Sequence, residues 1–211
     1  MEPGRIVTGD GVSDHIVQFF ETTDTLAASV AGFLHTGLDA GDNLLVLARP
    51  SHRDAVTNAL AARGASAAAL VSDGRLTLMD AGAAVDLIVR RGVPDASLFD
   101  ETIGSLVRKL GDTSRAGVRV YGELVDLLAE EGNFGAVEAL EDLWNGLAAV
   151  ERFTLLCGYQ AAHFGPWNAG GVLRRICAKH TRVDRHEGDL LANWLLRATV
   201  GPPPPEATGA S

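Results

Sequence analysis

A glutamate directly after a run of strand-forming residues is the first candidate for chemistry in this chain. Glu123 follows Val118–Tyr121 (VRVY). Ligands of parallel α/β proteins bind beyond the carboxyl ends of the strands, and a carboxylate that is partly removed from water needs a partner. Two interpretations are open: Glu123 recognises a ligand, or it bonds the N–H groups at the start of its own helix.

Aromatic and polar residues also end the other predicted strands. Because parallel strands end at a common edge of the sheet, these side chains are expected near Glu123. They mix apolar and polar groups, as small-molecule pockets do. The predicted ligand-binding residues at this edge are Phe20, Arg49, His52, Tyr121, Glu123 and Tyr159.

Histidine and cysteine side chains supply a second set of candidates. Cys177 and His180 are three residues apart in a predicted helix, so they share a face, and with Cys157 and His15 they could supply zinc ligands. The sequence does not show that the four meet, and buried cysteine is commonly a small apolar residue. We keep His15 and His180 as ligand-binding candidates and assign neither a metal nor a cofactor.

Nucleotide hydrolysis is not expected. A phosphate-binding loop requires GxxxxGK[ST] between a strand and a helix. The corresponding place, after Asn43–Ala48, reads Arg49-Pro50-Ser51-His52-Arg53-Asp54, and Pro50 lacks a backbone donor. The basic residues either attract an anion at the helix start or are solvated. The chain also has no GxSxG elbow, and we predict no enzymatic activity.

The elements that must position these residues alternate along the chain. Continuous apolar runs, typical of strands covered on both faces, occur at His15–Phe20, Asn43–Ala48, Leu76–Asp80, Val118–Tyr121 and Phe153–Tyr159. Helical periodicity or flanking breakers place helices at 23–38, 51–63, 83–91, 98–110, 122–131, 134–150, 172–182 and 190–200. Alternation predicts a three-layer α/β fold, with a mainly parallel sheet flanked by helices.

Bulk properties narrow the function classes. The 211 residues carry a net charge of −9, which disfavours binding to nucleic acid or anionic membranes. We find no apolar run long enough to span a bilayer and no signal peptide, and therefore expect a cytoplasmic protein with reduced cysteines. We expect a lead at 1–13, a sensory domain at 14–184, a helix at 185–200 and a Pro-rich tail at 201–211.

Several sequence pieces together resemble the MEDS family, the sensory domain of methanogens, methylotrophs and a dichloromethane-responsive regulator. They include HIVQFFETTDTL, RVYGELVDLLAEEGNF, ALEDLWNGLA, FTLLCGYQ and ICAKHTRV, and they span about residues 14 to 184. His15 and His180 lie in matching pieces. The resemblance implies a core like that of RecA- and KaiC-type ATPases, here with a degenerate nucleotide-binding loop.

The resemblance also implies a sensory input domain for simple hydrocarbon derivatives. Family members often sit beside histidine-kinase or DNA-binding domains, for which this chain has no room, so we expect it to signal to a separate partner, for instance in transcription regulation. The alternatives are a ligand-independent adaptor that docks on a kinase or transcription regulator, and a nucleotide-binding enzyme. Ligand identity and oligomeric state, a homodimer included, stay open.

Overall fold

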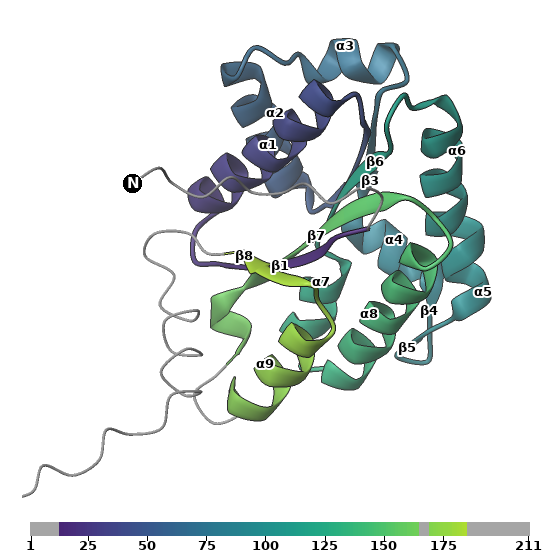
Figure 1. Ribbon diagram of the computed structural model, residues 1–211. Helices are drawn as coiled ribbons and strands as arrows, with labels where there is room; N and C mark the ends of the chain where they lie inside the picture. Colours follow the sequence, from purple (N-terminus) through teal and green to yellow (C-terminus); the bar gives the residue numbers. More distant parts are fainter. Residues whose placement is uncertain (1–12, 165–168, 185–211) are drawn as a thin grey trace, which may run out of the picture.

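A six-stranded parallel sheet forms the centre of the computed structural model, which describes residues 13–164 and 169–184 (Figure 1). The strand order is β3-β2-β6-β7-β1-β8, and every strand pair in this sheet is parallel. The strands are β1 (His15–Phe20), β2 (Asn43–Ala48), β3 (Leu76–Asp80), β6 (Val118–Gly122), β7 (Phe153–Gln160) and β8 (Arg182–Asp184).

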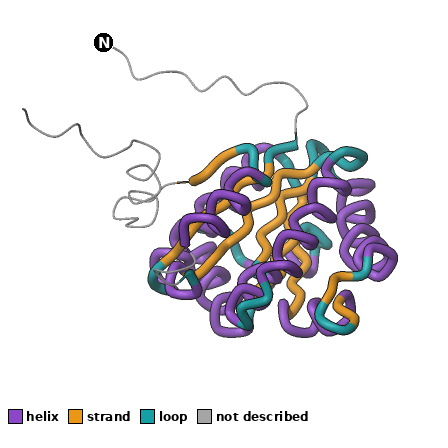
Figure 2. Tube along the Cα trace, turned by 90° about the horizontal axis from the view of Figure 1, so that it is seen from below, coloured by secondary structure: helices purple, strands orange, loops and turns teal. Residues whose placement is uncertain are grey.

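Helices cover both faces of this sheet (Figure 2). One face is packed by α1 (Thr23–Ala40) and α2 (Pro50–Ala62), through Leu34 and Leu60 among others. The other face carries α4 (Ala81–Ile88), α5 (Ala96–Phe99), α6 (Ser105–Thr113), α7 (Leu124–Glu130), α8 (Phe134–Ala148) and α9 (Ala169–Ala178). The structure confirms the predicted three-layer α/β class.

Side-chain alternation divides the apolar interior into two cores. Successive residues of a strand point to opposite faces, so Ile16 packs on the side of α1 while Val17 packs on the side of α8. Trp144 of α8 is 1% exposed and contacts the rings of Phe99 and Phe153. Trp144 is therefore a residue of the core on the α8 side of the sheet.

The five predicted strands are present, and their bounds differ by at most one residue. The structure differs from the prediction mainly in short elements, whose few residues carry no clear hydrophobic pattern. The final strand β8 and the helix α3 (Ala67–Ser72) were not expected, and the helix predicted at 98–110 is interrupted by a π-helical turn, Asp100–Gly104. The predicted helix at 172–182 ends at Ala178, which places His180 in the following turn.

A small hairpin replaces the end of the helix predicted at 83–91. Its strands β4 (Val89–Arg90) and β5 (Val93–Pro94) are joined by Arg91 and Gly92, which both have positive φ. Positive φ at both central residues defines the tight turn that suits antiparallel strands. Arg91 is not a typical residue for this position, so the turn was not predicted from the sequence.

Some predictions lie outside the described residues. These are the lead before residue 13, the helix at 190–200 and the Pro-rich tail. Within the described part of the chain, no helix is both long and apolar enough to cross a membrane.

Candidate functional site

Glu123 lies where β6 passes into α7, at the carboxyl edge of the sheet. Its backbone N–H donates to the carbonyl of Leu47 at 2.9 Å, which fixes it beside the end of β2. The residue is fully buried, and although it occupies the position before α7, its side chain makes no hydrogen bond that caps the helix. The interpretation of Glu123 as a carboxylate bonded to its own helix start is therefore wrong.

Three donors from other positions hold the Glu123 carboxylate. Oε1 accepts from Nδ1 of His52 at 2.8 Å and from the hydroxyl of Tyr121 at 2.7 Å. Oε2 accepts from the backbone N–H of Arg49 at 3.0 Å. Because a carboxylate only accepts, Nδ1 of His52 carries a proton. The structure thus unites Glu123 with three of its predicted neighbours.

The Arg49 side chain continues this arrangement toward the surface. Its guanidinium group donates to Asp126 at 2.5 Å and to Glu130 at 2.7 Å, and its Nε lies 3.7 Å from Glu123. The Asp126 side chain is fully buried, the Arg49 side chain is 21% exposed and the Glu130 side chain is 53% exposed. Arg49 therefore links buried carboxylates to solvent.

Asp126 is a site residue that the sequence analysis missed. Its Oδ1 accepts from the backbone N–H of Gln160 at 2.8 Å and from Nδ1 of His163 at 2.8 Å. A signal was present, because Asp126 follows Glu123 by three residues in a helix and so lies on the same side. His163, in the short 3₁₀ turn Ala161–His163 after β7, carried no comparable signal.

We call these residues the strand-end network: Arg49, His52, Tyr121, Glu123, Asp126, Glu130 and His163. It holds three carboxylates and one guanidinium, and its two imidazoles are the other groups that can carry positive charge. The Arg49 guanidinium already bonds carboxylates, so it is not directed at an anion at the start of α2. The arrangement favours hydrogen-bond donors and cations over phosphates.

Ring contacts complete the surroundings of the network. Phe20 at the end of β1 meets the His52 ring edge to face, with centroids 5.6 Å apart. Tyr121 lies across Gly158 of β7, and a Cβ on that glycine would be 2.8 Å from the tyrosine hydroxyl. Gly158 thus leaves the space that the Tyr121 ring occupies. Burial, followed by the charge of Glu123, raises the Tyr121 pKa well above its ordinary value.

The remaining predicted site residues lie in a different place. His15, Tyr159 and His180 meet on the face of the sheet covered by α8, around the fully buried Glu141. We call the set His15, Glu141, Cys157 and His180 the buried histidine cluster. Tyr159, which was predicted beside Glu123, therefore lies with the second set of candidates instead.

Glu141 is the centre of the buried histidine cluster. Its oxygens lie 3.1 Å from Nε2 of His15, 3.3 Å from Nε2 of His180 and 3.7 Å from Sγ of Cys157, and the Tyr159 hydroxyl donates to it at 2.5 Å. Glu141 was not predicted as a site residue, although it stands among Val137, Leu140 and Trp144 on the apolar stripe of α8. A charged residue on a buried stripe was the available signal.

Electrostatics within the cluster oppose the effect of burial. Burial alone would raise the pKa of Glu141. The charge and hydrogen-bond interactions with His180 and His15 outweigh burial and hold the Glu141 pKa below its ordinary value. Burial would lower the pKa of His180, yet Glu141 raises it. Burial, followed by the charge of Glu141, raises the pKa of the Cys157 thiol. Cys177 is outside the group, and burial raises its pKa to about 11.

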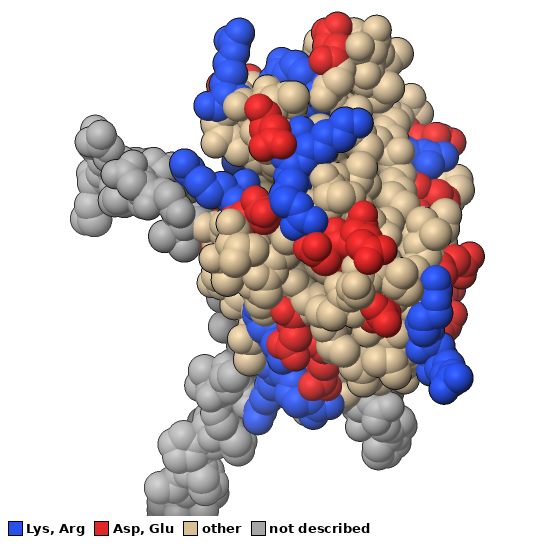
Figure 3. Space-filling view, turned by 90° about the vertical axis from the view of Figure 1, so that its right-hand side faces the viewer, with Lys and Arg blue, Asp and Glu red and all other residues tan. Residues whose placement is uncertain are grey.

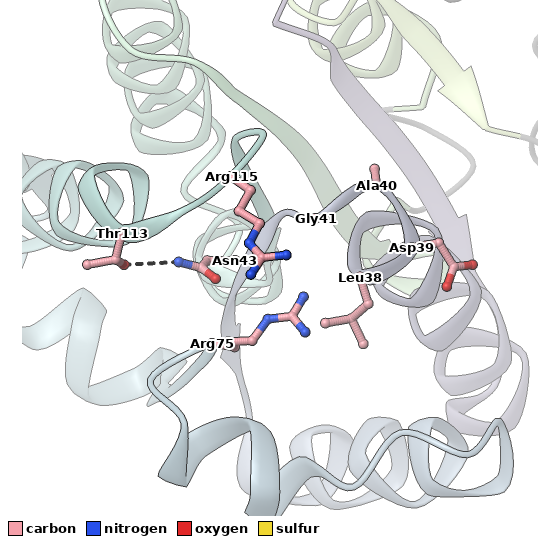
Figure 4. Close-up of a pocket in the computed structure, with 8 residues that line it drawn as sticks. All are labelled: Leu38, Asp39, Ala40, Gly41, Asn43, Arg75, Thr113 and Arg115. Atoms are coloured by element: carbon pink, nitrogen blue, oxygen red, sulfur yellow. Dashed lines mark hydrogen bonds between the residues drawn. The ribbon is translucent and has the colours of Figure 1, made fainter.

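A surface cleft of about 480 Å³ lies at the opposite edge of the sheet (Figure 4). It is bordered by the end of α1, the start of β2 and the segments before β3 and β6. The guanidinium groups of Arg75 and Arg115 lie between Asn43 and Leu38 in this view. None of the predicted site residues lines the cleft.

Charges on the face shown in Figure 3 are mixed. Acidic and basic side chains are interspersed there. The net charge of −9 is therefore not concentrated on that face as one field of a single sign.

Comparison with known proteins identifies the family. No curated protein matches the chain. The profile of the family described as MEDS, the methanogen/methylotroph, DcmR sensory domain, matches residues 14–181. This range includes both clusters, from His15 to His180, and most of the chain. The chain belongs to the MEDS family of sensory domains.

Proposed function

We propose that this MEDS domain binds a small molecule at the strand-end network and reports its presence to a signalling protein. One observation carries the proposal: two fully buried carboxylates, Glu123 and Asp126, share a single, partly exposed arginine at the ligand-binding edge of a parallel sheet. Membership of a sensory family supports the regulatory role.

The chemistry of the network defines the class of ligand. Asp126 is bonded to the Arg49 side chain through one oxygen and to Gln160 and His163 through the other. A ligand that donates a hydrogen bond can take the place of the guanidinium at Asp126. A short-chain alcohol or amine has such a donor, and Arg49 is the part of the network where a buried carboxylate comes nearest to solvent. This class agrees with the simple hydrocarbon derivatives that the family resemblance implies.

Arg49 also provides a route for the signal. Its backbone N–H is held by Glu123, and Arg49 is the residue immediately before α2. Displacement of its side chain therefore acts on the first turn of a surface helix. A ligand shifts such an equilibrium only if it binds the two positions of Arg49 with different affinity. We propose that α2 is the element whose change a partner detects.

The network does not favour nucleotide hydrolysis. An ATP phosphate would approach Glu123, Asp126 and Glu130, while the guanidinium that could attract it is bonded to two of these carboxylates. Pro50 begins α2 and offers no N–H group. We propose that the domain is not an enzyme.

The test compares ligand binding by the wild type and two matched variants. Methanol, methylamine, ethanol and dichloromethane are titrated by ligand-observed NMR, with thermal melting of each protein in parallel. Loss of a charge-assisted hydrogen bond costs about 1.5–3 kcal/mol, roughly ten- to a hundred-fold in affinity. Asp126→Asn is expected to weaken binding of an alcohol or amine by this factor.

Asp100→Asn is the control, because Asp100 forms an exposed ion pair with Arg108 outside the network. It should bind like the wild type. The proposal fails if none of the four compounds binds, or if Asp126→Asn melts at a lower temperature but binds with unchanged affinity. Hydrogen exchange in α2 should also change when the bound compound is added.

A further inference from the structure

The buried histidine cluster presents four ligand atoms to one point. His15 comes from the start of β1, Glu141 from α8, Cys157 from β7 and His180 from the turn after α9. Their ligand atoms all lie within 4.8 Å of one another. His15 is 3% exposed, while Glu141, Cys157 and the His180 side chain are 0% exposed.

A hydrogen bond on the outer side of His180 determines which ring nitrogen of the neutral imidazole faces the cluster. Nδ1 of His180 lies 2.7 Å from the carbonyl oxygen of Ile176. A carbonyl only accepts, so Nδ1 carries the proton and Nε2 of the neutral ring has a free lone pair. Nε2 is a buried nitrogen without a hydrogen-bond partner in the described structure, and it lies 3.3 Å from Glu141.

His15 is also oriented by a hydrogen bond on its outer side. The amide of Asn145 donates to the carbonyl of Lys179 at 3.0 Å, which leaves its oxygen directed at Nδ1 of His15, 2.9 Å away. Nδ1 of His15 therefore carries the proton. Its Nε2 lies 3.1 Å from Glu141 and 3.3 Å from Cys157.

When both rings are neutral, Nε2 of His15 and Nε2 of His180 each direct a lone pair at the Glu141 carboxylate, and one added proton relieves only one of these two contacts. A cation between the ligand atoms satisfies both. We propose that the buried histidine cluster binds one divalent cation of the Zn²⁺ class through His15, Glu141, Cys157 and His180. Histidine nitrogen, cysteine sulfur and carboxylate oxygen are the ligands of such ions. Metal-bound histidines commonly donate their other N–H to a carbonyl or carboxylate, as His180 does here.

Charge and distance agree with this assignment. A divalent cation neutralises the Glu141 carboxylate and the Cys157 thiolate and bonds both imidazoles, whereas a single proton neutralises Glu141 but gives only one of the two imidazoles an N–H directed at it. Tetrahedral zinc bonds of about 2.0–2.3 Å place ligand atoms roughly 3.3–3.8 Å apart. Oε2 of Glu141 lies 3.1 Å from Nε2 of His15 and 3.7 Å from Sγ of Cys157, and these two atoms are 3.3 Å apart. Nε2 of His180 lies 3.3 Å from the other oxygen, Oε1. Binding releases the Cys157 thiol proton to solvent.

The cation would join parts of the chain that are distant in sequence. His180 belongs to the turn that leads into β8, and Thr181 beside it bonds the backbone of His15 through its N–H at 2.7 Å. A metal bound to His15 and His180 would hold this turn against the sheet. The inference does not depend on the proposed ligand at the strand-end network, because the two sites share no residue.

The experiment uses the full chain expressed with added Zn²⁺ and, separately, unfolded with a chelator and refolded with Zn²⁺ or Co²⁺. One metal ion per chain is expected by elemental analysis. Co²⁺ should give the intense visible bands of a tetrahedral site and a thiolate charge-transfer band. Cys157→Ser should abolish the charge-transfer band, and Asn145→Ala, which keeps all four ligands, should weaken affinity about 10–100-fold.

Cys177→Ser is the matched control, since Cys177 is the other cysteine and lies outside the cluster. It should keep both the stoichiometry and the charge-transfer band. Circular dichroism confirms folding, and Glu141→Gln provides an isosteric variant if Cys157→Ser does not fold. A folded wild type without metal by both routes, a Co²⁺ spectrum without thiolate charge transfer, or equal losses in the two cysteine variants would each overturn the proposal.

Discussion

Replacement of Tyr121 by phenylalanine tests the hydrogen bonds that fix Glu123. The substitution removes the hydroxyl that donates to Glu123 at 2.7 Å and keeps the ring beside Gly158. The carboxylate is fully buried, so water cannot replace the lost donor without rearrangement. It still accepts from His52 and Arg49. A hydrogen bond to a charged group contributes about 1.5–3 kcal/mol, so Tyr121→Phe is expected to lower the free energy of unfolding by that amount.

Equilibrium unfolding in urea measures this change, with the dependence on denaturant expected to stay constant because the buried surface is unchanged. For a domain of this size, about 2 kcal/mol corresponds to a decrease in Tm of roughly 4–8 °C. In a Glu123→Gln background the bond has no charged partner, and Tyr121→Phe should cost only about 0.5–1.5 kcal/mol. The difference is the coupling energy of the pair. A loss below about 0.5 kcal/mol in the wild-type background, or equal losses in both backgrounds, would refute the assignment of this bond.

Four further outcomes are expected. Gly158→Ala places a Cβ 2.8 Å from the Tyr121 hydroxyl, so it should destabilise the fold by about 1–3 kcal/mol through overpacking, and equal or greater stability in urea would contradict this. Tyr121 and Tyr159 are the only tyrosines of the chain, and burial raises both pKa values well above 10. Stability is therefore fully present below about pH 10 and falls as pH rises further; tyrosinate absorbance that appears before unfolding would be inconsistent with this. Trp144→Ala should cost about 3–5 kcal/mol and Trp144→Phe much less, again by urea unfolding. Calorimetry with Mg²⁺ and ATP should give no binding heat, and tight magnesium-dependent binding would show that the start of α2 has been misinterpreted.

The sequence predicted the sheet well because its strands carry a strong local signal. Asn43–Ala48 is fully buried along its length, as a strand covered on both faces must be, and its apolar run shows this directly. The two-residue strands at Val89 and Val93 are too short for such a pattern. The end of α9 was also misjudged, because residues 179–182 contain no glycine or proline that would mark a stop after Ala178.

The candidate site was predicted in part. The topology of a parallel sheet shows which residues at the strand ends lie near each other, but it does not show which side chains of the covering helices contact them. Arg49 and Glu123 follow neighbouring strands β2 and β6, and the structure brings them together. Asp126 was missed because its role depends on how α7 packs beside Gln160 and the end of β7. No periodicity of the sequence specifies that distance.

Register and side-chain parity explain why the predicted residues form two sites. Alternate residues of a strand point to the same face of the sheet, so His15 points to the same side as Val17. Cys157 is the partner of Val17 in the parallel register of β1 and β7 and points to that side as well. They face α8, whereas Tyr121 faces α1 and lies across Gly158. At the carboxyl edge of the sheet, side chains from both faces can meet beyond the strand ends. Side chains farther back along the strands are kept apart by the sheet itself. His15 begins β1 and therefore lies away from the carboxyl edge, so it and the residues around Glu141 form a separate chemical environment from the strand-end network.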